Sequence, residues 1–275
     1  MNPTTTLDAR DIIAELGVVN PVDVDHEIER RVAFLCDYLV NARARCYVLG
    51  ISGGVDSLLA GRLAQLAVER ARAAGHPATF YAMRLPYGTQ ADEAAAQASL
   101  DFIRPDKRLT VDIKPATDAM RASLEAGGLV YRDDAHADFV TGNNKARQRM
   151  IAQYAVAGAQ EGLVIGTDQA AEALMGFFTK FGDGAADVIP LSGLSKRAVR
   201  SLARKLGAPE ELVMKVPTAD LETNSPQKPD EAAFGLTYEQ IDDFLEGKAV
   251  DAAASEKLKG VYRSTAHKRA LPVAP

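Results

Sequence analysis

The residues of this chain that are best suited to chemistry lie in one short loop, which runs from Gly50 to Ser57 and reads Gly-Ile-Ser-Gly-Gly-Val-Asp-Ser. An apolar run precedes the loop and a helical pattern follows it. The adjacent glycines let the backbone approach a ligand closely, and the N–H groups of a first helical turn lack partners within the helix, so they attract an anion. Ser52 adds a hydroxyl donor, as does Ser57. The loop is therefore predicted to cradle a phosphate.

Asp56 places a carboxylate in the same loop, where it would repel a phosphate unless a cation stood between the two. Mg²⁺ is the cation that prefers such oxygen ligands. The loop has no Gly-Lys-Ser/Thr ending, so it brings no lysine of the Walker A kind to the phosphates. We therefore expect a metal ion, Mg²⁺, beside the bound phosphate. The alternative is a Gly-Gly turn that joins a strand to a helix and binds nothing.

Hydrophobic periodicity predicts the elements that position this loop. Strands are expected at 46–51, 78–85, 108–113 and 162–166, and helices at 23–41, from near residue 57 to 74, and at 92–103, 115–126 and 144–159. Strands that alternate with helices form βαβ units and a mostly parallel sheet. Such sheets bind ligands beyond the carboxyl ends of their strands, so we expect Ser52, Tyr87 and Thr167 to face one site.

The last third of the chain is less regular. Ser195 is expected to cap the helix that follows it, and Thr237 with Gln240 forms a capping box for a helix at 238–246. Residues 215–229 lie between these helices and carry three prolines without a periodic pattern. We expect a mobile loop there.

Composition limits the class of protein. The chain has 275 residues and a net charge of −5, which fits one large α/β domain or two small ones and argues against general binding to nucleic acids or anionic membranes. Cys36 and Cys46 lack a metal-ligand spacing, so both are expected to be reduced core residues. The sequence has neither an apolar run of about 18 residues nor a leader after Met1. We therefore expect a cytoplasmic protein without a membrane span.

The Ser-Gly-Gly-Val-Asp-Ser loop resembles that of the ATP pyrophosphatases, which release pyrophosphate when a substrate oxygen attacks the α-phosphorus of ATP. Further clusters resemble the ammonia-dependent NAD synthetases of this superfamily; they lie at 142–150, 166–173, 176–184, 217–222 and 267–269. The resemblance runs from about residue 23 to 269. It implies a single Rossmann-like α/β domain with a helical extension at about 1–44, an ATP-binding core at about 45–207, and a lid with helices at about 208–275.

The resemblance also implies a reaction in two steps. The nicotinate carboxylate of deamido-NAD attacks ATP to give an adenylated intermediate and pyrophosphate, and ammonia then displaces AMP to give NAD, in the last step of NAD biosynthesis. No glutaminase domain fits beside the synthetase in 275 residues, so free ammonia is the expected nitrogen source. The family forms homodimers, and its partners are these small molecules rather than nucleic acids or membranes.

The resemblance assigns roles to single residues. The expected ATP-binding residues are Gly50, Ile51, Ser52, Gly53, Gly54, Val55, Asp56, Ser57, Thr167, Lys196 and Thr218. The expected Mg²⁺ ligands are Asp56 and Glu172. The expected deamido-NAD-binding residues are Arg147, Lys180, Asp187, His267 and Lys268, of which the last two would act across the subunit interface. Asp183 is expected to deprotonate ammonium, and Lys196 to assist at the phosphates.

Each assignment has a plainer alternative. Glu172 would suit the first turns of any helix, Lys196 a helix surface, and Asp183 a turn in which it bonds its own backbone. Phe177 and Phe178 would either stack on the nicotinate ring or belong to the core.

Other functions remain open at this stage. A tRNA thiolase or a GMP-synthetase-like subunit shares the loop, but a thiolase needs catalytic cysteines near ATP and a basic surface, whereas both cysteines here precede the loop. A nucleotide sensor without catalysis is the alternative of another class. It has little need for groups aimed at a transition state.

Overall fold

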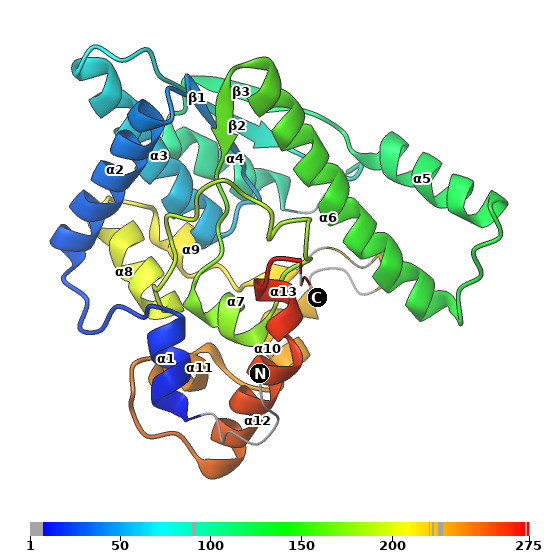
Figure 1. Ribbon diagram of the computed structural model, residues 1–275. Helices are drawn as coiled ribbons and strands as arrows, with labels where there is room; N and C mark the ends of the chain where they lie inside the picture. The colour runs from blue at the N-terminus through cyan, green and yellow to red at the C-terminus, as the bar shows by residue number, and fades with distance from the viewer. Residues whose placement is uncertain are drawn as a thin grey trace.

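In the computed structural model, one or two helices separate each strand from the next between Cys46 and Val164 (Figure 1). The structure describes residues 8–89, 92–219, 221, 223–224, 228–272 and 274. The strands are β1 (Cys46–Gly50), β2 (Thr79–Arg84), β3 (Lys107–Thr110), β4 (Gly162–Val164), β5 (Thr218–Ala219) and β6 (Lys228–Pro229). The helices are α1 (Ala9–Glu15), α2 (Val24–Asn41), α3 (Val55–Ala73), α4 (Glu93–Ile103), α5 (Lys114–Ala126), α6 (Asp134–Ala159), α7 (Ala170–Met175), α8 (Lys196–Lys205), α9 (Glu210–Val213), α10 (Asp230–Phe234), α11 (Tyr238–Leu245), α12 (Ala252–Ser264) and α13 (Ala266–Arg269).

The first four strands form a parallel sheet in the order β3-β2-β1-β4. Cys46 of β1 lies beside Thr79 of β2 and Gly162 of β4, and Tyr81 of β2 lies beside Lys107 of β3. Because all four strands run the same way, their carboxyl ends share one edge. The predicted single α/β domain with a parallel sheet flanked by helices is confirmed.

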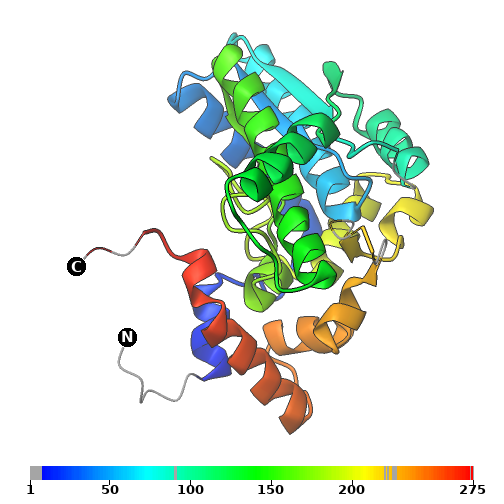
Figure 2. The same ribbon diagram turned by 90° about the vertical axis from the view of Figure 1, so that its right-hand side faces the viewer.

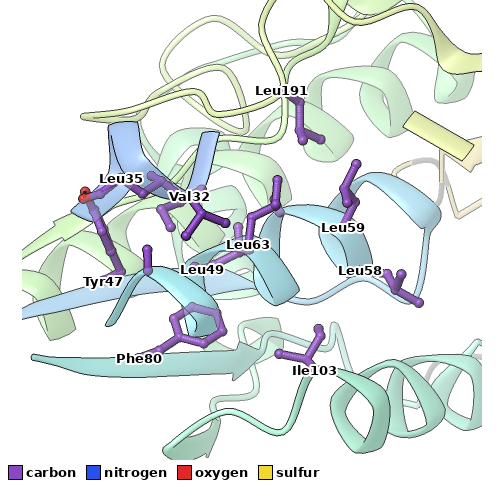
Figure 3. Packing of buried hydrophobic residues seen from close by; sticks show 14 of the residues in the cluster. Val32, Leu35, Tyr47, Leu49, Leu58, Leu59, Leu63, Phe80, Ile103 and Leu191 are labelled. Carbon is purple, nitrogen blue, oxygen red and sulfur yellow. Dashed lines mark hydrogen bonds between the residues drawn. The ribbon is translucent and has the colours of Figure 1, made fainter. Parts of the chain in front are cut away.

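The side chains of β1 alternate between two hydrophobic cores, so the strand is buried on both faces. Tyr47 and Leu49 face the larger core, which includes residues of α2, α3 and α8 (Figure 3). Cys46 and Val48 belong to the core on the other face, together with Ala157 of α6. Both cysteines of the chain are buried and free, as the sequence predicts.

A third core joins the two ends of the described chain. Ile12 of α1 belongs to it, with residues from α7, α10, α11 and α12, and Figures 1 and 2 both show α1 beside α12. Helix α1 was not predicted as a separate element, although Asp8 and Asp11 form its capping box. No described helix has the length and hydropathy that crossing a membrane requires.

Helix α6 begins at Asp134 rather than at residue 144, which corrects the predicted boundary. The side chain of Asp133 accepts the His136 N–H at 2.7 Å and so caps the helix. Its added turns were missed because Asp138 and Thr141 are buried polar residues that interrupt the apolar period. Figure 1 shows α5 beside α6, extending away from the sheet.

Candidate active site

The loop at residues 50–57 joins β1 to α3 at the carboxyl edge of the sheet. The Oγ of Ser52 accepts the Gly54 N–H at 3.2 Å, and the Oγ of Ser57 donates to the Gly54 carbonyl at 3.1 Å. The two hydroxyl oxygens lie 3.2 Å apart. These serines therefore shape the loop itself. Gly54, as N-cap of α3, offers no side-chain acceptor to the first turn, which leaves that turn suited to an anion.

Gly53 has a φ of +86°, a conformation that favours glycine, and it lies against α4. A Cβ at this position would come within 2.8 Å of the Ala96 backbone nitrogen. Gly53 therefore presses the loop against the start of α4. It is buried and does not line the cavity that the rest of the loop faces.

Replacing Gly53 by alanine should lower the free energy of unfolding by roughly 2–4 kcal/mol, because the left-handed conformation costs about 1–2 kcal/mol and the clash adds a similar amount. Gly75 is the matched control, since it has the same φ of +86° and nothing within 4 Å of its Cβ position. Urea unfolding of G53A and G75A separates the two costs. Equal destabilisation of both variants would contradict the close packing of the loop on α4.

A cavity of about 470 Å³ opens at this edge of the sheet. Most of the predicted site residues line it, namely Gly50, Ile51, Ser52, Gly54, Val55, Asp56, Ser57, Thr167, Glu172, Asp183, Lys196, Thr218 and Lys268. They come from segments far apart in the sequence, as expected where several strands end at one edge.

Lys196 is the most deeply buried charge of the cavity, with 1% of its side chain exposed. Its Nζ lies 2.6 Å from Oδ2 of Asp56 and 4.9 Å from the centre of the Tyr238 ring. Burial disfavours the charged ammonium, but the charges of Asp56 and Glu172 outweigh burial and raise the pKa of Lys196. The lysine is thus a fixed cation beside the phosphate-binding loop, and it is not the surface lysine that helix α8 alone would suggest.

Asp242 of α11 holds the start of α8 in place. Its Oδ1 accepts the Lys196 N–H at 3.0 Å, and its Oδ2 accepts the Arg197 N–H at 2.7 Å. Burial raises the pKa of this carboxyl to about 6, against the lowering effect of those N–H donors. The sequence analysis missed Asp242 because the partner N–H groups lie in a helix more than forty positions earlier.

Acidic side chains gather around the same cavity. Burial, and then the charge of Asp56, raise the pKa of Glu172 well above its usual range. Burial with the charge of Asp183 raises the pKa of Asp168 to about 7, and burial raises that of Asp183. Glu172 and Asp168 are half-buried and Asp183 is exposed by surface area. Glu172 and Asp183 line the cavity, so their exposed surface faces this cavity.

Asp168 was not among the predicted site residues, although it follows Thr167 directly. The pKa of Asp168 in the folded protein, about 7, lies above the usual value of 3.8. At a pH between these two values, Asp168 therefore takes up a proton when the chain folds. This contribution to stability is present below about pH 4 and is lost as the pH rises to about 7.

At pH 8 the free energy of unfolding of Asp168→Asn should therefore exceed that of the wild type, by at most about 4 kcal/mol. At pH 4 the two free energies should be almost equal. The measurement is urea unfolding at several pH values, without nucleotide or Mg²⁺. Exposed Asp37 of α2 supplies the control variant, Asp37→Asn, which should not change the pH dependence. A difference that stays constant between pH 4 and pH 8 would refute the raised pKa.

Two carboxylates in the cavity suit a divalent cation. Oδ1 of Asp56 is buried and has no hydrogen-bond partner among the described residues, so it lacks the compensation that a buried carboxylate oxygen requires. Burial and then the charge of Asp56 raise the pKa of Glu172, and a cation between the two carboxylates would offset that charge repulsion. Within the described part of the chain, no three His, Cys, Asp or Glu side chains come together as ligands. A cation held here needs further oxygens from a bound substrate.

Asp183 lies in a tight turn between Thr179 and Gly184. Its Oδ1 accepts the Thr179 N–H at 2.9 Å, and the Thr179 hydroxyl donates to Oδ1 of Asn143 on α6 at 2.8 Å. A Cβ on Gly184 would lie 2.4 Å from the Phe178 ring, which explains why glycine is needed there. Asp183 therefore both closes the turn and lines the cavity. Its predicted role as a base is thus compatible with the alternative that it bonds the backbone of a turn.

Of the residues predicted to bind deamido-NAD, Lys268 alone is among the cavity-lining residues. Its Nζ donates to the carbonyls of Gly176 and Phe178, both at 2.9 Å, and burial lowers its pKa. The other four lie outside the cavity, namely Arg147, Lys180, Asp187 and His267.

Three of those four residues are linked to one another by hydrogen bonds on the surface. Arg147 donates to the Lys180 carbonyl at 3.2 Å, and Lys180 Nζ donates to the His267 carbonyl. The carboxylate of Asp187 instead accepts the Val164 N–H at 2.7 Å, at the end of β4. Their roles in binding remain predictions.

Further cations that were not predicted as site residues also line the cavity, namely Arg84, Arg149, Lys215 and Lys228. Arg84 is buried at the end of β2, where its Nη2 lies 2.8 Å from Oε2 of Glu93. Arg149 donates to the Leu85 carbonyl at 2.9 Å. A signal for Arg84 was available, because an arginine that ends a buried strand requires a partner or a ligand. Together these cations favour a polyanionic ligand.

Phe177 and Phe178 also line the cavity. The ring of Phe177 packs edge-on against Phe234 at 4.6 Å between centroids, so it belongs partly to the third core. Stacking of either ring on a substrate stays a prediction.

Comparison with known proteins identifies close relatives along nearly the whole chain. A profile of the NAD synthase family matches residues 27–272. A curated protein named NH(3)-dependent NAD(+) synthetase from Burkholderia pseudomallei (strain 1106a) is 66% identical over 96% of this chain and 93% of its own length. Another protein of that name, from Streptomyces coelicolor, is 65% identical over 97% of this chain and 96% of its own length.

Solved structures show the same likeness. The crystal structure of NAD+ synthetase from Burkholderia pseudomallei has a TM-score of 0.84 at 64% identity and covers 96% of each chain. The structure of NMN synthetase from Francisella tularensis has a TM-score of 0.79 at 35% identity and covers 92% of this chain and 99% of that one.

Proposed function

Because this chain belongs to the NAD synthase family, we propose that it catalyses the ATP-dependent amidation of deamido-NAD with ammonia. The products are NAD, AMP and pyrophosphate, in the last step of NAD biosynthesis. The observation that carries this proposal is one cavity in which the phosphate-binding loop, the buried Lys196 and the carboxylates of Asp56, Glu172 and Asp183 face the same space.

ATP is the first substrate. The first turn of α3 and the loop before it bind its phosphates, and Thr167 and Thr218, which also line the cavity, contact the nucleotide. Asp56 and Glu172 hold Mg²⁺, and this ion supplies the positive charge that lets carboxylates and phosphates share one site. The unpartnered Oδ1 of Asp56 supports this assignment.

The nicotinate carboxylate is activated by adenylation. A carboxylate is a poor acyl donor because its oxygen leaves badly, whereas an acyl-adenylate releases AMP readily. Its attack on the α-phosphorus develops negative charge on the phosphoryl oxygens, and fixed cations stabilise that charge best when they are already in place. Lys196 meets this requirement, since Asp56 holds its ammonium at 2.6 Å.

Ammonia is the second nucleophile, and ammonium must lose a proton before it can attack. Asp183 accepts this proton. Because burial raises its pKa, Asp183 is a stronger base than an ordinary carboxylate at the same pH.

The test is to measure NAD and AMP together, with ATP and Mg²⁺ present. Ammonium chloride and glutamine are compared as nitrogen sources, and deamido-NAD is compared with nicotinate mononucleotide, the acid that corresponds to NMN. We expect NAD to form one-for-one with AMP from deamido-NAD and ammonium, and not from glutamine. Amidation of the mononucleotide alone would instead place the protein with the NMN synthetase of Francisella tularensis, and no product from either acid would refute the proposal.

We also propose that the protein is a homodimer in which α5 and α6 form the interface. Thr117 is the one buried residue of α5, and three apolar side chains of this region are 42–85% exposed, namely Met120, Leu124 and Val130. Exposed apolar surface of this kind favours a protein interface. In such a dimer, the hydrogen-bonded surface residues Arg147, Lys180 and His267 are available to a substrate bound near the partner subunit.

Leu124→Glu should therefore convert a dimer into a monomer of the chain mass, 29.4 kDa, because it places a charge in an apolar interface. Phe34→Glu is the matched control, since Phe34 is similarly exposed, 44%, on α2. Sedimentation velocity distinguishes the two states. A wild type that sediments as a monomer, or a dimer lost only in F34E, would contradict this interface.

We infer a cytoplasmic location from the two free, buried cysteines, which suit a reducing compartment. Burial raises the pKa of Cys46 to about 11, so its thiol is unreactive at neutral pH. Fractionation of cells that express the protein from its own sequence, with a periplasmic marker as reference, tests the location.

A further inference from the structure

Helix α6 presents a polar strip to the segment that follows β5. Asp138, Gly142 and Lys145 are spaced four and three residues apart, so they lie on one face of the helix. The exposed fraction is 8% for Asp138 and 3% for Lys145. We refer to these three residues as the docking strip. Buried charges on a helix require partners, and here Leu221, Thr223 and Asn224 supply them. We refer to these three residues as the docked segment.

The two charged residues of the docking strip bind backbone groups of that segment. Oδ1 of Asp138 accepts the Thr223 N–H at 2.8 Å, and its Oδ2 accepts the Asn224 N–H at 2.7 Å. Lys145 Nζ donates to the Leu221 carbonyl and to the Thr223 hydroxyl, both at 2.8 Å. These side chains satisfy backbone groups that a regular element would satisfy with its own hydrogen bonds.

Gly142 lets the segment come close to α6. A Cβ at Gly142 would lie 3.2 Å from both the Cβ and the carbonyl oxygen of Leu221. Few real Cβ atoms have neighbours at that distance, so a larger residue would push the segment away from the helix. The strip is thus fitted to the segment by shape as well as by charge.

The docked segment belongs to the wall of the active-site cavity. Leu221 lines the cavity, together with Lys215, Val216, Pro217 and Thr218 from the same connection. Lys145 also contacts a second loop at this edge, since its Nζ lies 4.3 Å from the centre of the Tyr87 ring. One lysine therefore touches two loops that follow different strands.

The charge of Asp138 is maintained despite burial. Burial alone would raise its pKa, but the N–H donors of Asn224 and Thr223 and the charge of Lys145 together lower it. Because a lowered pKa stabilises the folded form above the ordinary carboxyl value, this contact is at full strength at neutral pH and weakens only as the pH falls through the lowered pKa.

We propose that Asp138 and Lys145 are positioning residues that hold Leu221, Thr223 and Asn224 against the cavity and thereby exclude water from the adenylated intermediate. This inference rests on the proposed function. Water that reached the intermediate would attack the carbonyl carbon and break the bond to the AMP oxygen. The products would be deamido-NAD and AMP, so ATP would be consumed without NAD.

The experiment measures AMP and NAD in the same reaction for the wild type, Lys145→Met and Asp138→Asn. We expect the wild type to form them one-for-one and both variants to form several AMP per NAD, with the excess growing as ammonium is lowered. Lys107→Met and Asp134→Asn are matched controls, because Lys107 is exposed in β3 and Asp134 is exposed on α6 itself. Both controls should keep the one-for-one ratio.

Hydrogen exchange in the absence of substrates gives a readout independent of catalysis. The Thr223 and Asn224 amides should lose protection by about tenfold or more in Asp138→Asn, since a hydrogen bond to a charged acceptor is worth at least that factor. If the wild type makes no NAD, the proposed function fails, whatever the variants do. If the wild type makes NAD and folded variants keep both the one-for-one ratio and the protection, the positioning role is overturned.

Discussion

Lys196→Met should reduce kcat by about 10²- to 10³-fold, the usual effect of removing one preorganised charge from a transition state. The ammonium of Lys196 is fixed beside the phosphate-binding loop by Asp56, 2.6 Å away, and 1% of its side chain is exposed. Water cannot replace it there without reorganising the cavity. The rate of pyrophosphate release should decrease as much as the rate of NAD formation, because the charge of Lys196 is needed in the first step.

The same substitution should lower the free energy of unfolding by about 3–5 kcal/mol, since it leaves Asp56 and Glu172 together without their buried counter-ion. Lys205→Met is the matched control on the same helix. Lys205 pairs with Asp25 on the surface, where both side chains are more than half exposed, so its loss should cost about 1 kcal/mol or less. Activity within about threefold of the wild type in a folded K196M would show that the lysine has no part in adenylation.

Asp183→Asn should retain adenylation and lose amidation, by about 10²- to 10⁴-fold in NAD formation. Asparagine keeps an oxygen that accepts the Thr179 N–H, so the turn should hold its shape. It cannot accept a proton from ammonium. Pyrophosphate release and NAD formation, measured in parallel, should therefore separate in this variant while they stay coupled in the wild type.

Hydroxylamine sharpens this prediction, because it is largely unprotonated at neutral pH and needs no base before it attacks. We expect D183N to form the hydroxamate at a rate close to that of the wild type and the amide much more slowly. Equal losses with both nucleophiles would indicate that Asp183 supports the geometry of the cavity and does not accept the proton. Normal NAD formation would remove Asp183 from the mechanism altogether.

The parallel sheet could be predicted from sequence because its strands are short apolar runs buried on both faces. The elements that periodicity missed are those stabilised by polar contacts over long separations. The first turns of α6 carry buried Asp138, whose backbone partners lie some eighty positions later. The apolar residues of short α1 pack in a core made mainly by the last third of the chain.

The site could be predicted in part, because some of its residues belong to recognisable motifs. Asp56, Glu172 and Lys196 were identified by motif, and the structure brings them into one cavity. Asp168, Asp242 and Arg84 were not, because their importance depends on burial and on neighbours that only the folded chain supplies. Arg147 and His267 lie outside the cavity, so their roles in binding deamido-NAD stay predictions.

The most direct test of the central claim follows the oxygen atoms of the nicotinate carboxylate. Deamido-NAD labelled with ¹⁸O in both carboxyl oxygens is converted with ATP, Mg²⁺ and ammonium, and the products are analysed by mass spectrometry. If the carboxylate attacks the α-phosphorus and ammonia then displaces AMP, each AMP carries one labelled oxygen and the amide of NAD keeps the other. Label in inorganic phosphate or pyrophosphate, with none in AMP, would contradict an adenylated intermediate and with it the role assigned to the cavity.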